Sequence, residues 1–195
     1  MGRGSVIEVR IHGRGGQGNV VAAYLLAGAA IGEGWHALAF PAFGAERRGA
    51  PVAAFVRMDR GVFRRRDQVA RPHFLIVQDA ALLHVPGVLE GLRPGGGLLI
   101  NAPRDPDGAG LPGKRFTVAA TQLAQEHLGR PVPNTALLAV FLTLTGLLPI
   151  AALRRALRER FRGRVLEANE VLLEMAANLP PPRAWALEEA DAAGA

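Results

Sequence analysis

A glycine-dense turn between an apolar strand and a long apolar helix constrains this chain more than any other feature. Residues 6–31 read VIEVRIHGRGGQGNVVAAYLLAGAAI, with alternating polarity before the turn and an almost wholly apolar segment after it. Gly13, Gly15, Gly16 and Gly18 allow the backbone to turn sharply and to expose its N–H groups at the start of the helix. The positive end of the helix dipole faces whatever lies above the turn. The turn is therefore a candidate anion site.

The turn satisfies the dinucleotide-binding pattern G-x-G-x-x-G at Gly13, Gly15 and Gly18, but the rest of that fingerprint is missing. A NAD or FAD site also needs an acidic residue about 20 residues further on, which binds the ribose hydroxyls. The second predicted strand ends Phe-Pro-Ala-Phe at residues 40–43, without such an acid. A Walker A loop is excluded because no Gly-Lys-Ser/Thr follows. The pattern therefore favours another ligand or a partner chain over a dinucleotide.

Further polar groups near the turn complete a candidate site. Gln17 carries an amide that donates and accepts hydrogen bonds at once. Residues 43–51 read FGAERRGAP and place two planar guanidinium groups in a restrained loop, which suits a carboxylate or a phosphate. Two alternatives stay open: the glycines serve only helix–strand packing, and the arginines pair with Glu46 or Asp59. The candidate cofactor-binding residues are Gly13, Gly15, Gly16, Gln17, Gly18, Arg47 and Arg48.

Composition excludes several kinds of chemistry. The chain of 195 residues contains no cysteine, which rules out disulfides, cysteine-ligated metals, iron–sulfur clusters and a thiol nucleophile. The five histidines show no metal-ligand spacing, and no catalytic triad or carboxylate pair stands out, so we expect no catalytic residue and no metal site. The net charge of +6 is carried by arginine, with Lys114 as the single lysine. Because aromatic residues are few and not interleaved with the arginines, we expect no nucleic acid partner.

One long apolar segment raises the question of a membrane span. Residues 136–153 are apolar except for two threonines and Gly146, and Pro149 also interrupts them. About 13 residues of uninterrupted helix remain, which is short of the roughly 20 that cross a bilayer. The N-terminus lacks a signal-peptide core. The sequence therefore predicts a buried or subunit-facing helix in a soluble, cytoplasmic protein that does not bind a membrane.

Alternation of strand and helix patterns predicts the fold class. We expect an α/β protein with three α/β/α layers and a mostly parallel, mixed sheet, and the third strand, after a short loop, antiparallel to the second. A single domain of residues 1–180 has a helical C-terminal third and ends at three prolines, before a Pro-rich, acidic tail at 181–195. Thr121 is expected to cap its helix. The predicted strands are 6–11, 36–40, 52–58, 74–77, 98–100 and 116–119. The predicted helices are 19–31, 80–92 with a break at Pro86, 121–128, 135–147, 150–161 and 165–179.

Several motifs together resemble a known family. The sequences GRGGQG at 13–18 and AFPAFGAERRGAP at 39–51, with Arg57 in the following strand, are similar to the gamma subunit or domain of pyruvate and related 2-oxoacid:ferredoxin oxidoreductases. The resemblance covers about residues 5–175. Later pieces that agree with it are Gln78-Asp79, Leu99-Ile100-Asn101, Ala120-Thr121, Gly129-Arg130-Pro131 and Asn134-Thr135.

The resemblance implies one part of a multi-subunit enzyme, inactive alone. Such enzymes decarboxylate a 2-oxoacid oxidatively, pass the acyl group to coenzyme A and reduce ferredoxin. The resemblance places thiamine diphosphate, magnesium and iron–sulfur clusters on alpha, beta and delta partner subunits, and gamma parts near the point where coenzyme A arrives. Coenzyme A is thus an expected contact of this chain. Two other hypotheses remain: a stand-alone nucleotide- or CoA-binding α/β protein, and a purely structural scaffold subunit.

Overall fold

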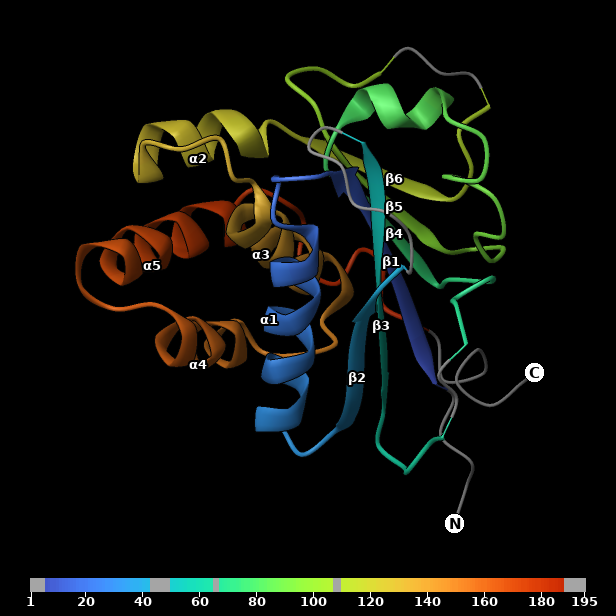
Figure 1. Ribbon diagram of the computed structural model, residues 1–195, viewed down its shortest axis with the longest axis horizontal. Coiled ribbons are helices and arrows are strands. Elements are labelled where there is room, and N and C mark those ends of the chain that lie inside the picture. The colour runs from blue at the N-terminus through green and yellow to red at the C-terminus, as the bar shows by residue number, and fades with distance from the viewer. Residues whose placement is uncertain (1–5, 43–49, 65–66, 107–109, 188–195) are drawn as a thin grey trace.

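A six-stranded mixed sheet forms the centre of the computed structural model, which describes residues 6–42, 50–64, 67–106 and 110–187 (Figure 1). The strands stand in the order β2-β3-β1-β4-β5-β6. β1 pairs with β4 in parallel, as do β4 with β5 and β5 with β6, whereas β3 runs antiparallel to both of its neighbours. The elements are β1 (Ile7–Arg14), α1 (Asn19–Gly32), β2 (His36–Pro41), β3 (Pro51–Asp59), β4 (Phe74–Val77), the 3₁₀ helix η1 (Ala80–His84), β5 (Gly97–Asn101), β6 (Lys114–Val118), α2 (Ala120–Leu128), α3 (Asn134–Thr145), α4 (Ile150–Arg160) and α5 (Gly163–Ala177).

The expected α/β class is confirmed, with its mostly parallel, mixed sheet and its helical C-terminal third. The predicted reversal of β3 is also confirmed. Residues 42–50 join β2 to β3, and this connection is shorter than the dozen or more residues that a crossover between parallel strands needs. The two strands therefore pair as neighbours that run in opposite directions.

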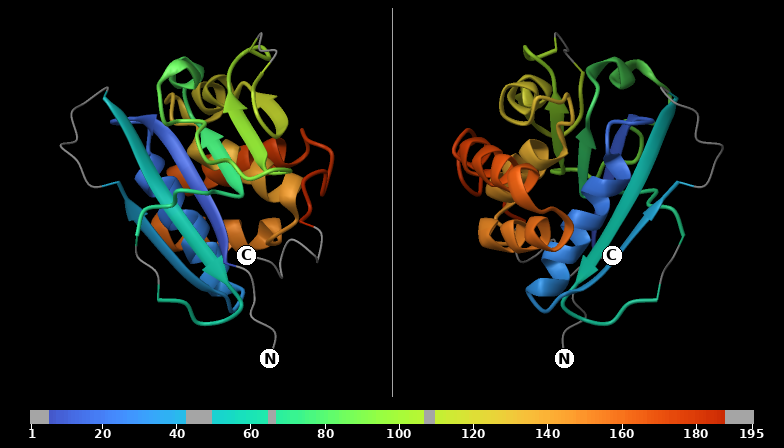
Figure 2. Two further views of the ribbon diagram at one scale, coloured as in Figure 1. Left: turned by 90° about the vertical axis from the view of Figure 1, so that its right-hand side faces the viewer. Right: turned by 60° about the vertical axis from the view of Figure 1, so that its left-hand side comes forward.

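The two faces of the sheet are covered unequally. Helices α1 to α5 lie on one face, and η1 with its flanking loops covers β4 and β5 on the other (Figures 1 and 2). Val9 and Ile11 point to the helical side, whereas Leu75 and Val77 point to the η1 side. The helix predicted for residues 80–92 is wrong in length, because regular structure stops at His84 and the chain continues in turns.

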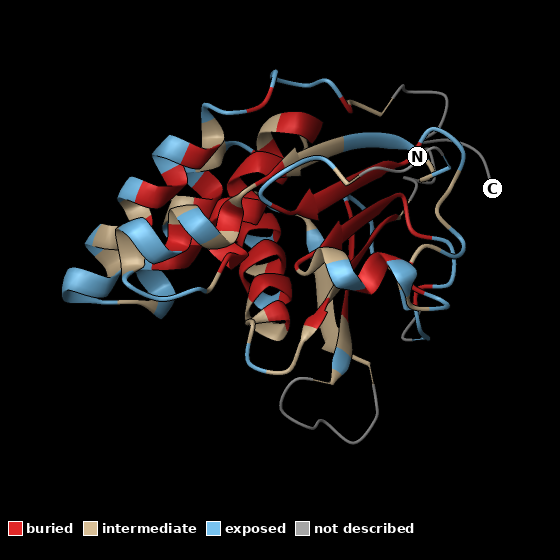
Figure 3. Ribbon diagram, turned by 90° about the horizontal axis from the view of Figure 1, so that it is seen from above, coloured by how far each residue is buried: buried red, intermediate tan, exposed pale blue. Residues whose placement is uncertain are grey.

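The long apolar segments are buried helices. α1 packs on the sheet and on α4, whose Ala156 side chain would lie 3.9 Å from a Cβ at Gly28. α3 is buried along nearly its whole length, as the sequence predicts, and its C-cap is Gly146, with a positive φ of 64°. Figure 3 shows the buried residues gathered where the helices pack on the sheet. In the described part of the chain, no helix has both the length and the apolar character that crossing a membrane requires.

The chain packs into the body of the fold beyond the prolines at 180–182, where the sequence predicts its end. Trp185 is only 4% exposed, and its ring stacks on Phe74 with 6.4 Å between the ring centroids. The backbone N–H of Trp185 donates to the carbonyl oxygen of Leu144 at 2.7 Å. Trp185 therefore belongs to the core and Leu187 packs against it, beyond the prolines.

The η1 side of β1 and of the neighbouring β3 carries a group of buried charged residues. Arg57 is 1% exposed and donates through Nε to Glu8 Oε1 at 2.8 Å. Arg10 donates to four backbone carbonyls, including that of Glu90 at 2.6 Å. A buried charge is tolerated when it is paired and hydrogen-bonded. These arginines consequently fix the loops around residues 67–69 and 87–90 to the sheet.

Candidate functional site

The glycine turn is tighter than the sequence predicts. β1 continues through Arg14, so that only residues 15–18 separate it from α1. Gly16 has a φ of 97° and Gly18 a φ of 82°, whereas Gly15 is not among the residues with positive φ. Gly18 is the N-cap of α1 and provides no side chain to bind the first N–H groups of the helix. The conformational need for glycine therefore lies at Gly16 and Gly18.

Gly13 lies where a side chain would be tightly packed. A Cβ at Gly13 would lie 3.1 Å from Gln17 Oε1 and 3.2 Å from the Asn19 amide. Gln17 folds back so that its Oε1 accepts from the backbone N–H of Arg14 at 2.7 Å. Asn19 Nδ2 donates to the carbonyl of Val52 at 2.9 Å and attaches the helix start to β3. The carbonyl of the Gln17 amide thus stabilises the turn itself.

An ion pair joins the turn to the end of β4. Arg14 Nε lies 2.6 Å from Asp79 Oδ2, and both side chains are partly exposed. The other carboxylate oxygen of Asp79 accepts from the N–H of Ala81 at 3.0 Å, at the start of η1. Asp79 therefore holds the turn, β4 and η1 in one arrangement.

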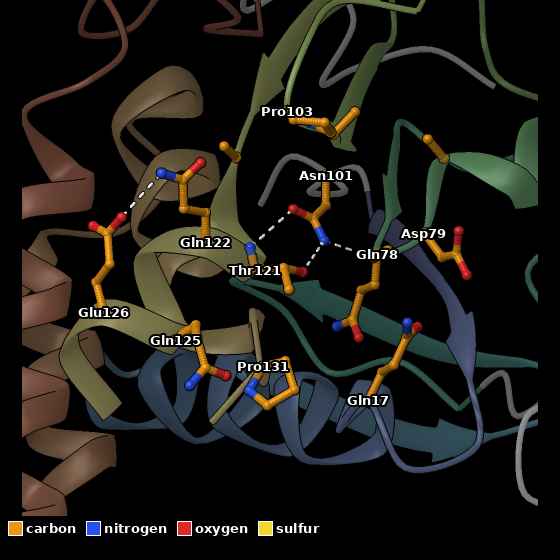
Figure 4. A pocket seen from close by; sticks show the side chains of 13 residues that line it. Gln17, Gln78, Asp79, Asn101, Pro103, Thr121, Gln122, Gln125, Glu126 and Pro131 are labelled. Atoms are coloured by element: carbon orange, nitrogen blue, oxygen red, sulfur yellow. Dashed lines mark hydrogen bonds between the residues drawn. The ribbon is translucent and has the colours of Figure 1, made fainter. Parts of the chain in front are cut away.

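A pocket of about 680 Å³ lies at the carboxyl ends of β4 and β5, beside this turn and the start of α2 (Figure 4). Strands β2 and β3, which follow β1 in the chain, lie on one side of β1 in the sheet, whereas β4, β5 and β6 lie on its other side. The strand order therefore reverses between β1 and β4. Ligands in open α/β sheets bind at such switch points. The pocket is lined by Gln17, Gln78, Asp79, Ala80, Asn101, Ala102, Pro103, Ala119, Thr121, Gln122, Gln125, Glu126 and Pro131.

The polar side chains of the pocket lining carry little free charge. Five of the residues are carboxamides: Gln17, Gln78, Asn101, Gln122 and Gln125. Its two carboxylates are engaged, since one pairs with Arg14 and the other accepts from Gln122 at 3.0 Å. No arginine or lysine of the described residues lines the pocket. The polar groups of the pocket are therefore mostly neutral donors and acceptors, in contrast to the anion site that the turn predicts.

Asn101 organises the wall between the sheet and α2. Its Nδ2 donates to the carbonyl of Gln78 at 2.8 Å and to Thr121 Oγ1 at 2.6 Å, and its Oδ1 accepts from the N–H of Thr121 at 3.1 Å (Figure 4). The prediction that Thr121 caps α2 is wrong, because the N-cap is Ala119 and makes no side-chain bond. Asn101, 20 residues earlier, satisfies the helix start instead.

Gln78 is the exception in this network. The residue is 1% exposed, and neither Nε2 nor Oε1 of its amide has a hydrogen-bond partner among the described residues. Buried polar side chains in folded proteins are almost always paired. The Gln78 amide therefore marks a place where the free chain leaves hydrogen-bonding capacity unused.

His12 lies one residue before the turn. Its Nε2 is buried and has no hydrogen-bond partner in the described ranges. Burial, reinforced by the charge of Arg10, lowers the pKa of His12 to about 4. Its imidazole is consequently neutral at physiological pH. Within the described parts of the chain, no group of three or more His, Asp and Glu side chains is placed to hold a metal ion.

Comparison with known proteins identifies the family. The sequence profile described as pyruvate ferredoxin/flavodoxin oxidoreductase matches residues 8–179. The chain belongs to this family. The match includes the turn, the sheet except for Ile7 at the start of β1, and the pocket lining, so the site described above lies within the family's common region.

Relatives in this family correspond to the chain over nearly their full length. The pyruvate synthase subunit PorC of Methanocaldococcus jannaschii is 44% identical, and the match covers 89% of this chain and 96% of the relative. The pyruvate/ketoisovalerate oxidoreductases common subunit gamma of Thermococcus kodakarensis is 42% identical with the same coverages. The crystal structure of the pyruvate oxidoreductase subunit PORC of Thermotoga maritima is 35% identical with a TM-score of 0.79, covering 89% of this chain and 96% of that one. The chain is a gamma-type subunit of a 2-oxoacid:ferredoxin oxidoreductase, as the resemblance implies.

The structure brings part of the predicted site together. Gly13, Gly15, Gly16, Gln17 and Gly18 form the turn, and Gln17 borders the pocket. Arg47 and Arg48 lie outside the described residues. That these residues bind a ligand stays a prediction.

Sequence reasoning missed most of the pocket. Gln78, Asn101, Thr121 and Pro131 all belong to motifs that carry the family resemblance, yet none is among the candidate binding residues. A usable signal exists in the sequence: Gln78 directly follows one parallel strand and Asn101 ends the next one. Because parallel strands end at one edge of a sheet, polar residues there converge.

Proposed function

We propose that this gamma subunit assembles with alpha, beta and delta partners in the cytoplasm and supplies part of the coenzyme A site through the pocket beside the glycine turn. The assembly oxidatively decarboxylates pyruvate or a related 2-oxoacid and reduces ferredoxin. Thiamine diphosphate, magnesium and iron–sulfur clusters belong to the partners in this proposal. It is supported for the clusters by the absence of cysteine from the sequence.

The name of one relative supports a role common to several substrates. The Thermococcus kodakarensis protein is described as a subunit common to pyruvate and ketoisovalerate oxidoreductases. A subunit shared by enzymes for two 2-oxoacids suits a step that both reactions have in common. Acceptance of the acyl group by coenzyme A is such a step, whereas discrimination between the 2-oxoacids belongs to another chain.

The observation that carries the proposal is the pocket of about 680 Å³ at the strand-order reversal. Its size lies within the range of cofactor sites. Its carboxamides match the amide groups and the heterocyclic base of coenzyme A. The N-terminus of α1, without a side-chain cap, adds backbone N–H groups beside the pocket for an anionic group.

Filling the pocket tests the proposal. Gln125 is exposed on α2 and borders the cavity, so a Gln125→Trp side chain obstructs it without disturbing the core. In the enzyme reconstituted from all subunits, we expect the KM for coenzyme A to rise roughly tenfold while the KM for the 2-oxoacid stays within about twofold. Glu159→Trp, exposed on α4, is the matched control and should leave both constants unchanged.

The result that contradicts the proposal is an unchanged KM for coenzyme A in the Gln125→Trp enzyme. A structural scaffold is the second candidate, and the engagement of Gln17 within its own turn favours it. Under that hypothesis, omission of the chain abolishes assembly, while pocket variants leave every kinetic constant unchanged. If 2-oxoacid-dependent ferredoxin reduction proceeds equally well without the chain, both candidates fail.

A further inference from the structure

We propose that Gln78 determines the specificity of this pocket by pairing its amide with an uncharged ligand group that carries a hydrogen-bond donor beside an acceptor. The inference rests on the proposed coenzyme A site and names the chemical class of the ligand group that enters the pocket. Amides and the edges of heterocyclic bases have this chemistry, whereas phosphates do not. The phosphates of the ligand are then bound outside the cavity.

The first observation is the unused hydrogen-bonding capacity of Gln78. Both amide atoms are buried without partners among the described residues, although the side chain belongs to the pocket lining. Figure 4 shows this side chain directed toward the space between Gln17 and Pro131. An apolar residue in this place would avoid the desolvation of an unpaired amide. A ligand that displaces the neighbouring side chains and reaches the amide supplies the missing partners.

The second observation is the rigid support of Gln78. Its backbone N–H donates to the carbonyl of His12 at 2.8 Å, and its carbonyl accepts from Asn101 Nδ2 at 2.8 Å. The residue also directly follows the buried strand β4. Its backbone is therefore fixed from two sides, so the amide meets a ligand in a preorganised position.

The third observation is the charge of the pocket. Its charged side chains are the carboxylates Asp79 and Glu126, and no cationic side chain of the described residues lines it. Asp79 is already neutralised by Arg14, whereas Glu126 is paired only with the neutral amide of Gln122. A phosphate placed there would meet the Glu126 carboxylate and no free cationic side chain of the described lining residues. A neutral amide or base meets no such repulsion. The lining thus selects against the charged part of coenzyme A and in favour of its neutral parts.

Two parts of coenzyme A have the required chemistry, and fragments distinguish them. Pantetheine carries the amides without the base, and adenosine carries the base without the amides. In the reconstituted complex, we expect one of these to compete with coenzyme A in a calorimetric titration and so to identify the bound group. Inorganic pyrophosphate should compete much more weakly. Competition by pyrophosphate alone, with none by either neutral fragment, would overturn the proposal.

Substitution of Gln78 provides the second test. Gln78→Leu keeps the approximate volume and removes the amide, so we expect roughly tenfold weaker binding of coenzyme A by the complex. The melting temperature of the free chain should be unchanged or higher, because an unpaired buried amide is gone. Gln78→Glu keeps the shape but adds a charge, and it should weaken binding as well. Gln68→Leu, exposed in the loop before β4 and outside the pocket lining, is the matched control.

The outcomes separate this inference from the proposed function. If the complex binds coenzyme A with the same affinity in the Gln78→Leu and wild-type forms, only the role of Gln78 fails. A lowered melting temperature of the free Gln78→Leu chain would show that the amide is already paired without ligand, which also overturns the inference. If the wild-type complex binds coenzyme A but Gln125→Trp has no effect on it, the pocket itself is refuted as the site, and both proposals fail.

Discussion

Alanine substitutions in the glycine turn test which positions need glycine for a positive φ and which also lack space for a Cβ. Gly16 and Gly18 both have positive φ, where an L-residue costs about 1–2 kcal/mol. A Cβ at Gly16 meets nothing within 4 Å, so Gly16→Ala should cost only this amount. A Cβ at Gly18 would lie 3.1 Å from Asn134 Nδ2 and 3.4 Å from Val132 Cγ1. Gly18→Ala should therefore cost about 2–3 kcal/mol, because the Asn134 side chain must also give way by a few tenths of an ångström.

Thermal unfolding followed by circular dichroism measures this difference. For a chain of this size, 1 kcal/mol corresponds to about 2–4 °C in Tm, so Gly18→Ala should melt several degrees below Gly16→Ala. Gly32→Ala at the end of α1 is the matched control, since its φ is not positive and a Cβ there meets open space. It should be neutral or slightly stabilising. Equal melting temperatures for all three variants would refute the assignment of the strained positions.

Three further substitutions address other parts of the account. Glu8→Ala removes the buried carboxylate that pairs with Arg57 Nε and leaves only the more exposed Asp67 at 3.4 Å, so it should lower the free energy of unfolding in urea titrations by at most about 3–5 kcal/mol. Adding Arg57→Met should recover part of this loss, and a double variant as unstable as Glu8→Ala would contradict the pairing. Trp185→Ala should cost about 3–5 kcal/mol in the same assay, whereas wild-type stability would exclude this residue from the core. The pKa of His12 is lowered from 6.5 to about 4 in the folded chain, so the unfolded chain binds more protons between these pH values. The stability that neutral His12 contributes is complete above pH 6.5 and is lost as the pH falls through about 4. The urea midpoint of the His12→Asn variant should consequently depend less on pH in this window than that of the wild type. An unchanged pH dependence would contradict the burial of the imidazole.

The sequence predicts the regular elements well where local pattern and tertiary environment agree. The short apolar run of β4 has the predicted bounds, and α1 begins at Asn19 as the glycine turn indicates. The turn itself is less predictable. Which glycine takes a positive φ depends on how far β1 pairs with β3, and that pairing extends to Arg14 opposite Pro51. The spacing of the glycines in the sequence does not show how far β1 pairs with β3.

The pocket depends on contacts that a local pattern does not encode. Thr121 looks like a helix cap, yet Asn101 from β5 takes that role because the two elements meet at the same sheet edge. The prolines before Trp185 suggest a tail, yet the indole finds an apolar site against Phe74. The Gln78 amide becomes conspicuous only when its burial and its lack of partners are known. Polar residues at the strand ends indicate the edge of the sheet where a site can lie. The tertiary packing of the side chains then decides which of them line the cavity.

Hydrogen–deuterium exchange of the reconstituted complex, with and without coenzyme A, tests the central claim most directly. We predict that coenzyme A slows exchange at the backbone amides of residues 15–20 and 119–122, which border the pocket from the turn and from the start of α2. Exchange in α4, away from the pocket, should stay the same. Protection by coenzyme A that is confined to partner subunits, with no change in these two segments, would contradict the account.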